Sequence, residues 1–180
     1  LNGLAEKEFS GETREIIPSP RVASYDQKPE MSAKAITDRV VKEILAEKYD
    51  FFVINFANPD MVAHTGDLKA TVEALEAVDE QLGKIADATL AKGGAMLITA
   101  DHGNAEELTN LQTGKIDKEH STNPVPCIVV GAEYEGQAGG QIEAVGGDLS
   151  LLPPVGTLSD MAPTVLKLMG LKKPKEMTGV

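Results

Sequence analysis

The sequence predicts an α/β fold in which helices flank a mostly parallel sheet. Apolar residues recur at helical spacing in several segments, and short, continuously apolar runs alternate with those segments. Continuous apolar runs are typical of strands buried on both faces, as in parallel sheets. The length of 180 residues suits one domain with a sizeable core.

The first third of the chain predicts an irregular start, a helix and a strand. Residues 1–31 show little hydrophobic period, and three prolines interrupt any continuous helix or central strand. Residues 32–48 carry apolar side chains at three- and four-residue spacing, which predicts an amphipathic helix with Ser32 as its N-cap. Residues 51–56 are nearly all apolar and predict a buried strand.

Two helical segments are predicted next. Asn58 is a suitable N-cap and Gly66 a suitable terminator, so residues 58–66 predict a short helical turn. Residues 68–91 carry a single apolar stripe that includes Leu68, Val78 and Ile85, and a Gly-Gly pair follows. This pattern predicts a long amphipathic helix.

The second half predicts two strands joined by a long polar loop. We expect strands at residues 95–100 and 125–130, with the loop at residues 103–124. The single cysteine, Cys127, lies in the second of these apolar runs and is expected to be a buried structural thiol.

The C-terminal part predicts one further helix. A weak strand is expected near residues 141–145, within a glycine-rich stretch. Ser159 is the expected N-cap of a last helix, which Gly170 ends.

Charge and composition exclude several functions. The chain has 28 acidic and 17 basic residues, a formal net charge of −11, which repels nucleic-acid phosphates and anionic lipids. Small ligands and divalent cations are the expected partners. A lone cysteine, no apolar run of about 20 residues and no signal-peptide pattern predict a cytoplasmic protein.

The first candidate site lies on the short helical turn. Asp60 and His64 are four residues apart, so their side chains lie on one face and could share a metal ion. A surface contact between the two would be the simpler interpretation if this pair stood alone.

A second pair follows the strand predicted at residues 95–100. Asp101 and His102 would lie at the edge where open α/β sheets place their active sites. Adjacent residues of an extended chain point to opposite faces, so two ions would accommodate them better than one. The alternative is that Asp101 only caps the next turn.

The third histidine, His120, ends the long loop, which has the length to fold back across the sheet. An exposed loop residue is the alternative. The five groups are too few to fill the shells of two divalent ions, so water, substrate or further chain must complete them. Mixed carboxylate and imidazole ligands suit both Mn²⁺ and Zn²⁺. Neither Ser121 nor Ser159 has a context that would activate it as a nucleophile, and no glycine-rich phosphate loop is present.

Five motifs together resemble a known family. They are an Arg-Val-Ala-Ser-Tyr-Asp to Pro-Glu-Met-Ser segment within residues 18–32, Asn-Pro-Asp-Met-Val-Ala-His at 58–64, Thr-Ala-Asp-His-Gly-Asn at 99–104, His-Ser-Thr-Asn at 120–123 and Asp-Met-Ala-Pro-Thr at 160–164. In this order they resemble the C-terminal part of the cofactor-independent (2,3-bisphosphoglycerate-independent) phosphoglycerate mutases of the alkaline phosphatase superfamily. Pro124 and the length of residues 133–158 depart from that family's usual pattern.

The resemblance implies that residues 1–180 are the C-terminal portion of a metal-binding phosphatase domain with an alkaline-phosphatase-like layered fold. It implies a glycolytic isomerase that interconverts 3-phosphoglycerate and 2-phosphoglycerate through a phosphoserine. Asp60, His64 and His120 would bind one Mn²⁺, and Asp101 and His102 the other. The serine and the substrate-binding domain would lie upstream of residue 1, so the chain alone is expected to be inactive.

Two alternatives fit the same residues. Another metalloenzyme of the same superfamily, such as a phosphopentomutase, phosphodiesterase or phosphatase, would share the metal ligands. An acidic, non-catalytic α/β module would carry the same residues as ordinary loop polars.

Overall fold

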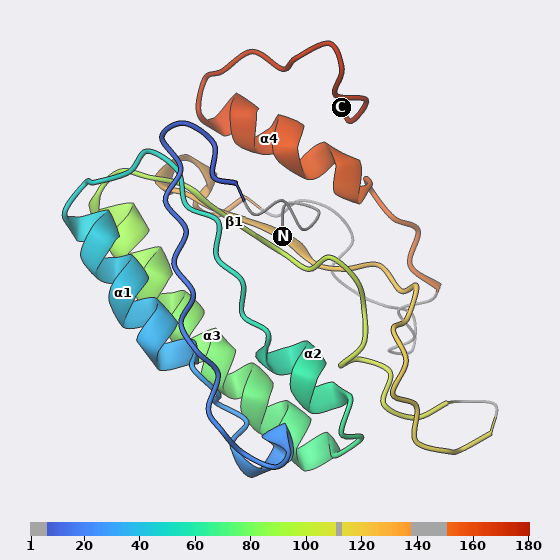
Figure 1. The fold of residues 1–180 in the computed structure, drawn as a ribbon. Helices are drawn as coiled ribbons and strands as arrows, with labels where there is room; N and C mark the ends of the chain where they lie inside the picture. Colours follow the sequence, from blue (N-terminus) through green and yellow to red (C-terminus); the bar gives the residue numbers. More distant parts are fainter. Residues whose placement is uncertain (1–6, 111–112, 138–150) are drawn as a thin grey trace.

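The computed structural model describes residues 7–110, 113–137 and 151–180. Its longer elements are three helices in the first half, then two strands and a last helix (Figure 1). They are α1 (Ala33–Leu45), α2 (Asn58–Ala63), α3 (Leu68–Ala91), β1 (Met96–Thr99), β2 (Cys127–Val130) and α4 (Met161–Leu168). This arrangement confirms the predicted α/β class.

The two strands pair antiparallel. Met96 lies opposite Val130, and Thr99 lies opposite Cys127. The expectation of parallel pairing is therefore wrong for this pair, because the long loop reverses the chain direction between β1 and β2. Cys127 is exposed, which corrects the prediction of a buried thiol. Its strand is one of only two in the described sheet, so much of its surface lacks a covering layer.

Residues 51–56 do not form the predicted strand. They run extended toward α2, and no strand of the described ranges pairs with them. Phe51 and Val53 are 51% and 64% exposed. The segment has the apolar composition of a strand, but a strand also needs a hydrogen-bonded neighbour.

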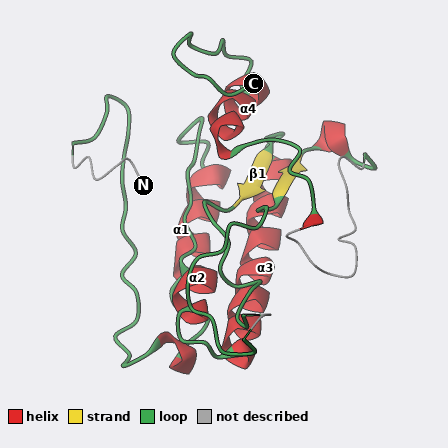
Figure 2. Cartoon of the chain, turned by 90° about the vertical axis from the view of Figure 1, so that its right-hand side faces the viewer, coloured by secondary structure: helices red, strands yellow, loops and turns green. Residues whose placement is uncertain are grey.

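Helices α1 and α3 lie side by side, and α2 packs near the N-terminal part of α3 (Figures 1 and 2). Met31, Val62 of α2, and Ala70 and Ala74 of α3 form a buried cluster, with Tyr25 packed against it. The buried face of α3 is rich in small residues, and Leu68 is 66% exposed. The predicted apolar stripe is therefore only partly buried, because α1 and α2 cover a neighbouring face.

Two of the three predicted N-caps are wrong, and the third holds by position only. Ser32 stands at the N-cap of α1, but its hydroxyl donates to the carbonyl oxygen of Pro18 at 2.6 Å instead of capping the helix. Asn58 is the first residue of α2 and donates from Nδ2 to the carbonyl oxygen of Pro29 at 2.9 Å. Ser159 lies inside a 3₁₀ turn (Leu158–Asp160).

Thr157 caps the 3₁₀ turn before α4. The backbone N–H of Thr157 donates to Asp160 Oδ2 at 2.7 Å, in a reciprocal capping box. Asp160 Oδ1 also accepts from the backbone N–H of Val180 at 2.8 Å. The weak strand expected near residues 141–145 lies outside the described residues. Among the helices that the structure describes, none has the length and apolar character needed to cross a bilayer.

The N-terminus of α3 allows a direct test of helix capping. Asp67 Oδ1 accepts a hydrogen bond from the backbone N–H of Ala70 at 2.9 Å. Asp67→Ala is expected to lower the free energy of unfolding by about 1 kcal/mol, because an N–H of the first turn loses its acceptor. Urea unfolding followed by circular dichroism measures the change. Asp67→Asn, which keeps the acceptor, is the matched control, and equal midpoints for Ala and Asn would contradict the assignment.

Candidate metal centre

Helix α2 brings the first two candidate ligands together. Asp60 and His64 are one helical turn apart, and Asp60 Oδ1 lies 3.3 Å from His64 Nε2. Gly66, with φ of +78°, ends the turn just beyond His64. A side chain is strained in this left-handed region, so glycine suits the position where the chain leaves α2 for α3.

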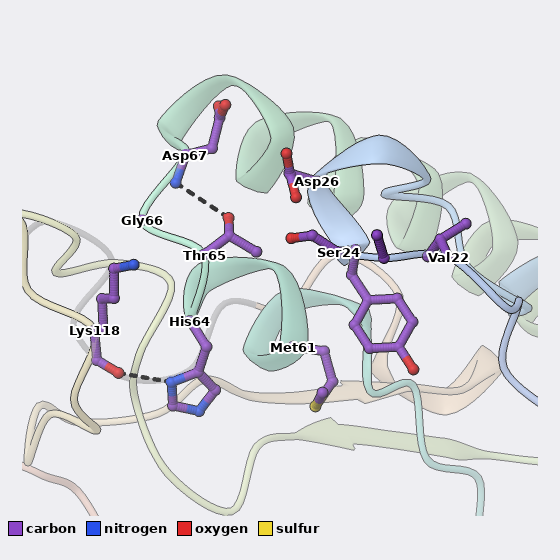
Figure 3. A pocket seen from close by; sticks show the side chains of 11 residues that line it. Val22, Ser24, Asp26, Met61, His64, Thr65, Gly66, Asp67 and Lys118 are labelled. Atoms are coloured by element: carbon purple, nitrogen blue, oxygen red, sulfur yellow. Dashed lines mark hydrogen bonds between the residues drawn. The ribbon is translucent and has the colours of Figure 1, made fainter.

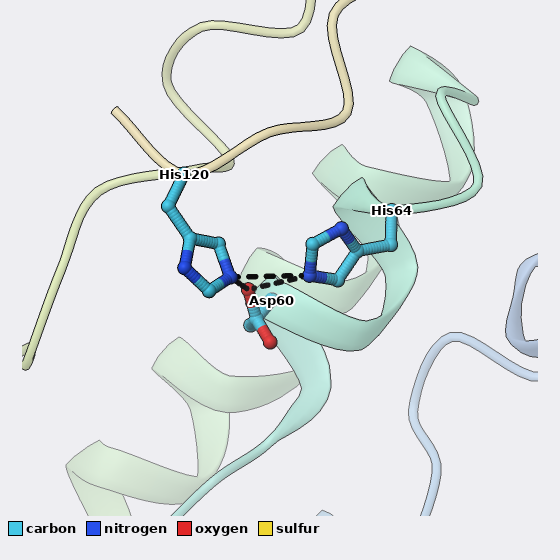
Figure 4. Close-up of side chains that lie close together, drawn as sticks. All are labelled: Asp60, His64 and His120. Carbon is cyan, nitrogen blue, oxygen red and sulfur yellow. Dashed lines mark hydrogen bonds and ion pairs between the residues drawn. The ribbon is translucent and has the colours of Figure 1, made fainter.

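The long loop adds the third candidate ligand by folding back onto α2. His120 Nε2 lies 3.3 Å from Asp60 Oδ1 and 3.2 Å from His64 Nε2. Figure 4 shows the three side chains converging from α2 and the loop. All three are partly exposed, so the site is open to solvent.

Asp101 and His102 lie beside this triad without joining it. The side chain of Asp101 is 85% exposed, and its Oδ1 is 3.7 Å from His102 Nε2. The ring of His102 stacks on the ring of His120, with centroids 3.8 Å apart and planes 16° apart. Three of the five sequence-predicted residues therefore share one cluster; His102 contacts it through its stacked ring, and Asp101 lies beside His102.

The tautomer of His64 follows from the hydrogen bond that its Nδ1 atom makes. His64 Nδ1 lies 2.6 Å from the carbonyl oxygen of Lys118. A carbonyl can only accept, so Nδ1 carries the hydrogen, and in the neutral ring Nε2 keeps its lone pair. Nε2 is the atom that faces Asp60 and His120, so the ring is oriented as a metal ligand requires.

Asn104 supports the triad and was not identified from the sequence. Its side chain is buried, and Nδ2 donates to Asp60 Oδ1 at 2.7 Å. Within the described residues, Asn104 Oδ1 has no hydrogen-bond partner although it is buried. The only sequence signal was its place two residues after His102.

Glu106 was also missed, although it lies four residues after His102. Burial raises the pKa of its carboxyl. Hydrogen bonds from Ser121, from the Asn104 backbone and from Asn123 lower the pKa by more, so it lies below the usual value. Glu106 is therefore an ionised acceptor at neutral pH.

His64 also lines an open cavity of about 680 Å³ (Figure 3). Its wall combines the segment around Ser24 and Asp26 with the end of α2 and with Lys118. His64 thus lines the cavity and also belongs to the triad.

Comparisons with known proteins agree with a metal site. The sequence model of the metalloenzyme superfamily, a protein-family model, matches residues 1–173. The 2,3-bisphosphoglycerate-independent phosphoglycerate mutase of Clostridioides difficile is 50% identical over 179 residues, which is 99% of this chain and 32% of the relative. The second such mutase of Methanosarcina barkeri is also 50% identical, over 99% of this chain and 31% of the relative.

A solved structure shares the fold. The crystal structure of Leishmania mexicana phosphoglycerate mutase at low cobalt concentration matches with a TM-score of 0.76 and 31% identity. The match covers 96% of this chain and 32% of that chain. This chain thus spans about a third of the length of the relatives that it matches.

Proposed function

This chain belongs to the metalloenzyme superfamily, and on that basis we propose that it is the metal-binding portion of a 2,3-bisphosphoglycerate-independent phosphoglycerate mutase. The observation that carries the proposal is the triad of Asp60, His64 and His120, assembled from two distant segments in a chain 50% identical to such mutases. The parent protein would be a glycolytic, cytoplasmic isomerase that interconverts 3-phosphoglycerate and 2-phosphoglycerate through a phosphoserine.

The separations within the triad fit a divalent ion. Its three ligand atoms lie 3.2–3.3 Å from one another. Ligand atoms lie about 3.3–3.4 Å apart in a tetrahedral site with bonds of about 2.0–2.1 Å. They lie about 3.0 Å apart in an octahedral site with bonds of about 2.1 Å. The separations of 3.2–3.3 Å match the tetrahedral spacing and lie about 0.2–0.3 Å above the octahedral one, so the three atoms are close enough together to hold one ion such as Mn²⁺ or Zn²⁺.

We assign one ion to the triad and a second to Asp101 and His102, with Mn²⁺ as the proposed metal. Such ions supply positive charge to the oxygens of a transferring phosphoryl group and lower the pKa of an attacking hydroxyl. The buried, unpaired Oδ1 of Asn104 supports the presence of a further polar group here, because an unsatisfied buried oxygen is costly.

Neighbouring residues of the chain hold the proposed metal ligands in a fixed orientation. The Lys118 carbonyl fixes the His64 tautomer, and Asn104 holds the carboxylate of Asp60. The ring of His102 packs against His120 and limits its rotation. Ligands held in place in this way lose little freedom when they bind an ion.

We expect the 180-residue chain alone not to isomerise phosphoglycerate, since the relatives named as mutases are about three times as long. The serine and the substrate-binding residues would belong to the rest of the parent protein. Another superfamily enzyme, such as a phosphopentomutase or phosphatase, would share the ligands, but the identity to mutases along 99% of the chain favours the mutase.

A segment exchange tests this function. The matching third of the Clostridioides difficile mutase is replaced by the 179 residues of this chain that match it, and 2-phosphoglycerate formation is followed by phosphorus magnetic resonance. We expect isomerisation of 3-phosphoglycerate and none of ribose phosphates. A folded exchange protein that binds Mn²⁺ but leaves 3-phosphoglycerate unchanged would contradict the proposal.

A further inference from the structure

Two segments far apart in the sequence meet beside the triad. Residues 101–104 follow β1, and residues 120–123 lie at the end of the long loop. Their backbones join at an isolated antiparallel bridge between Gly103 and Ser121, where the N–H of Ser121 donates to the Gly103 carbonyl at 2.9 Å. A single bridge of this kind gives little resistance to rotation of the loop.

One carboxylate adds three hydrogen bonds to this junction. Glu106 Oε2 accepts from the backbone N–H of Asn104 at 2.8 Å. Glu106 Oε1 accepts from the hydroxyl of Ser121 and from Nδ2 of Asn123 at 3.1 Å. Both oxygens of an ionised carboxylate are thus used, and such charge-assisted bonds are stronger than neutral ones.

Gly103 makes room for this contact. A Cβ atom at Gly103 would overlap both Ser121 Oγ and Glu106 Oε1. The backbone φ of Gly103 is not in the left-handed region, so the requirement for glycine here is one of space. The close approach of Ser121 and Glu106 to the Gly103 backbone agrees with the hydrogen bonds between their side chains.

The junction determines where His120 lies. His120 directly precedes Ser121, its ring stacks on His102, and its Nε2 reaches Asp60. We propose that Glu106 is a positioning residue that holds the His120 segment in place and so completes the triad. The functional value of this role rests on the proposed metal function. The position of the His120 segment is nevertheless a property of the chain without metal.

The test compares three single variants of the 180-residue chain. Glu106→Ala removes the carboxylate, Ser121→Ala removes one donor to it, and Glu119→Gln is the matched control. Glu119 is an exposed carboxylate on the same loop, next to His120, so the control changes charge at a similar place without touching the junction.

The first measurement is the histidine ring spectrum by proton–carbon magnetic resonance, without metal. We expect the ring resonances of His102 and His120 to shift in Glu106→Ala, because the stacked rings separate, and to stay unchanged in Glu119→Gln. Unchanged ring resonances in a folded Glu106→Ala chain would overturn the proposal. If circular dichroism shows that this variant is unfolded, Ser121→Ala decides in the same way.

The second measurement is Mn²⁺ titration by calorimetry. We expect Glu106→Ala to bind Mn²⁺ about 10–100-fold more weakly, as is typical when a group that orients metal ligands is removed. Equal affinities would overturn the positioning role. Failure of the unsubstituted chain to bind Mn²⁺ would instead argue against the metal function of the chain, and the ring spectra would still decide the role of Glu106.

Discussion

Replacing His120 by alanine in the segment-exchanged mutase is expected to lower kcat about a thousandfold or more. His120 is the one candidate ligand of the triad that comes from neither α2 nor its C-cap. Stabilisation of the transition state by a bound ion is worth several kcal/mol, and each ~1.4 kcal/mol is a factor of ten in rate. Loss of the ion from the triad therefore removes most of the rate enhancement that it supplies.

Steady-state kinetics and Mn²⁺ calorimetry on the same variant check this prediction. The titration should show about one ion fewer per chain than in the unsubstituted protein. Glu119→Ala is the control, because this exposed side chain directly precedes His120. Near-normal turnover of the His120→Ala protein would exclude His120 as a ligand.

Ile85→Ala is expected to lower the free energy of unfolding by about 3 kcal/mol. Ile85 is 2% exposed and is among the largest fully buried side chains of the described residues. Truncating a buried isoleucine removes apolar burial and leaves a cavity, at a cost of about 2–5 kcal/mol. This is a large part of the about 5–15 kcal/mol that typically separates folded from unfolded domains.

Urea unfolding of the 180-residue chain measures this change. Leu75→Ala on the same helix is the control, since Leu75 is 43% exposed, and its cost should stay below about 1 kcal/mol. Similar shifts for both variants would show that the buried face of α3 does not dominate the stability of the chain.

Local sequence patterns predicted the helices well. The long helix was expected over residues 68–91 and lies at Leu68–Ala91, because an aspartate cap and a Gly-Gly pair set its ends locally. The pairing of strands was not predictable in the same way. Residues 51–56 have strand composition, but whether a neighbour pairs with them depends on chain far away.

The sequence predicted the candidate ligands of the site better than the residues that hold those ligands in place. The spacing of Asp60 and His64 follows from helical periodicity, and their contact could be expected from it. The return of His120 depends on a backbone bridge at Gly103 and on the carboxylate of Glu106, which leave no periodic signal. The Lys118 carbonyl is a backbone group that any residue at that position would supply, so sequence carries no information about it.

The separation of the triad along the chain has a thermodynamic consequence. Asp60 and His64 are neighbours in any helical state, whereas His120 is 56 residues beyond His64. An unfolded chain would have to close that loop to bring the third ligand in, at a cost in conformational entropy that grows with loop length. A divalent ion that requires all three side chains therefore binds the folded chain selectively. Increasing the free concentration of that ion would raise the melting temperature by mass action.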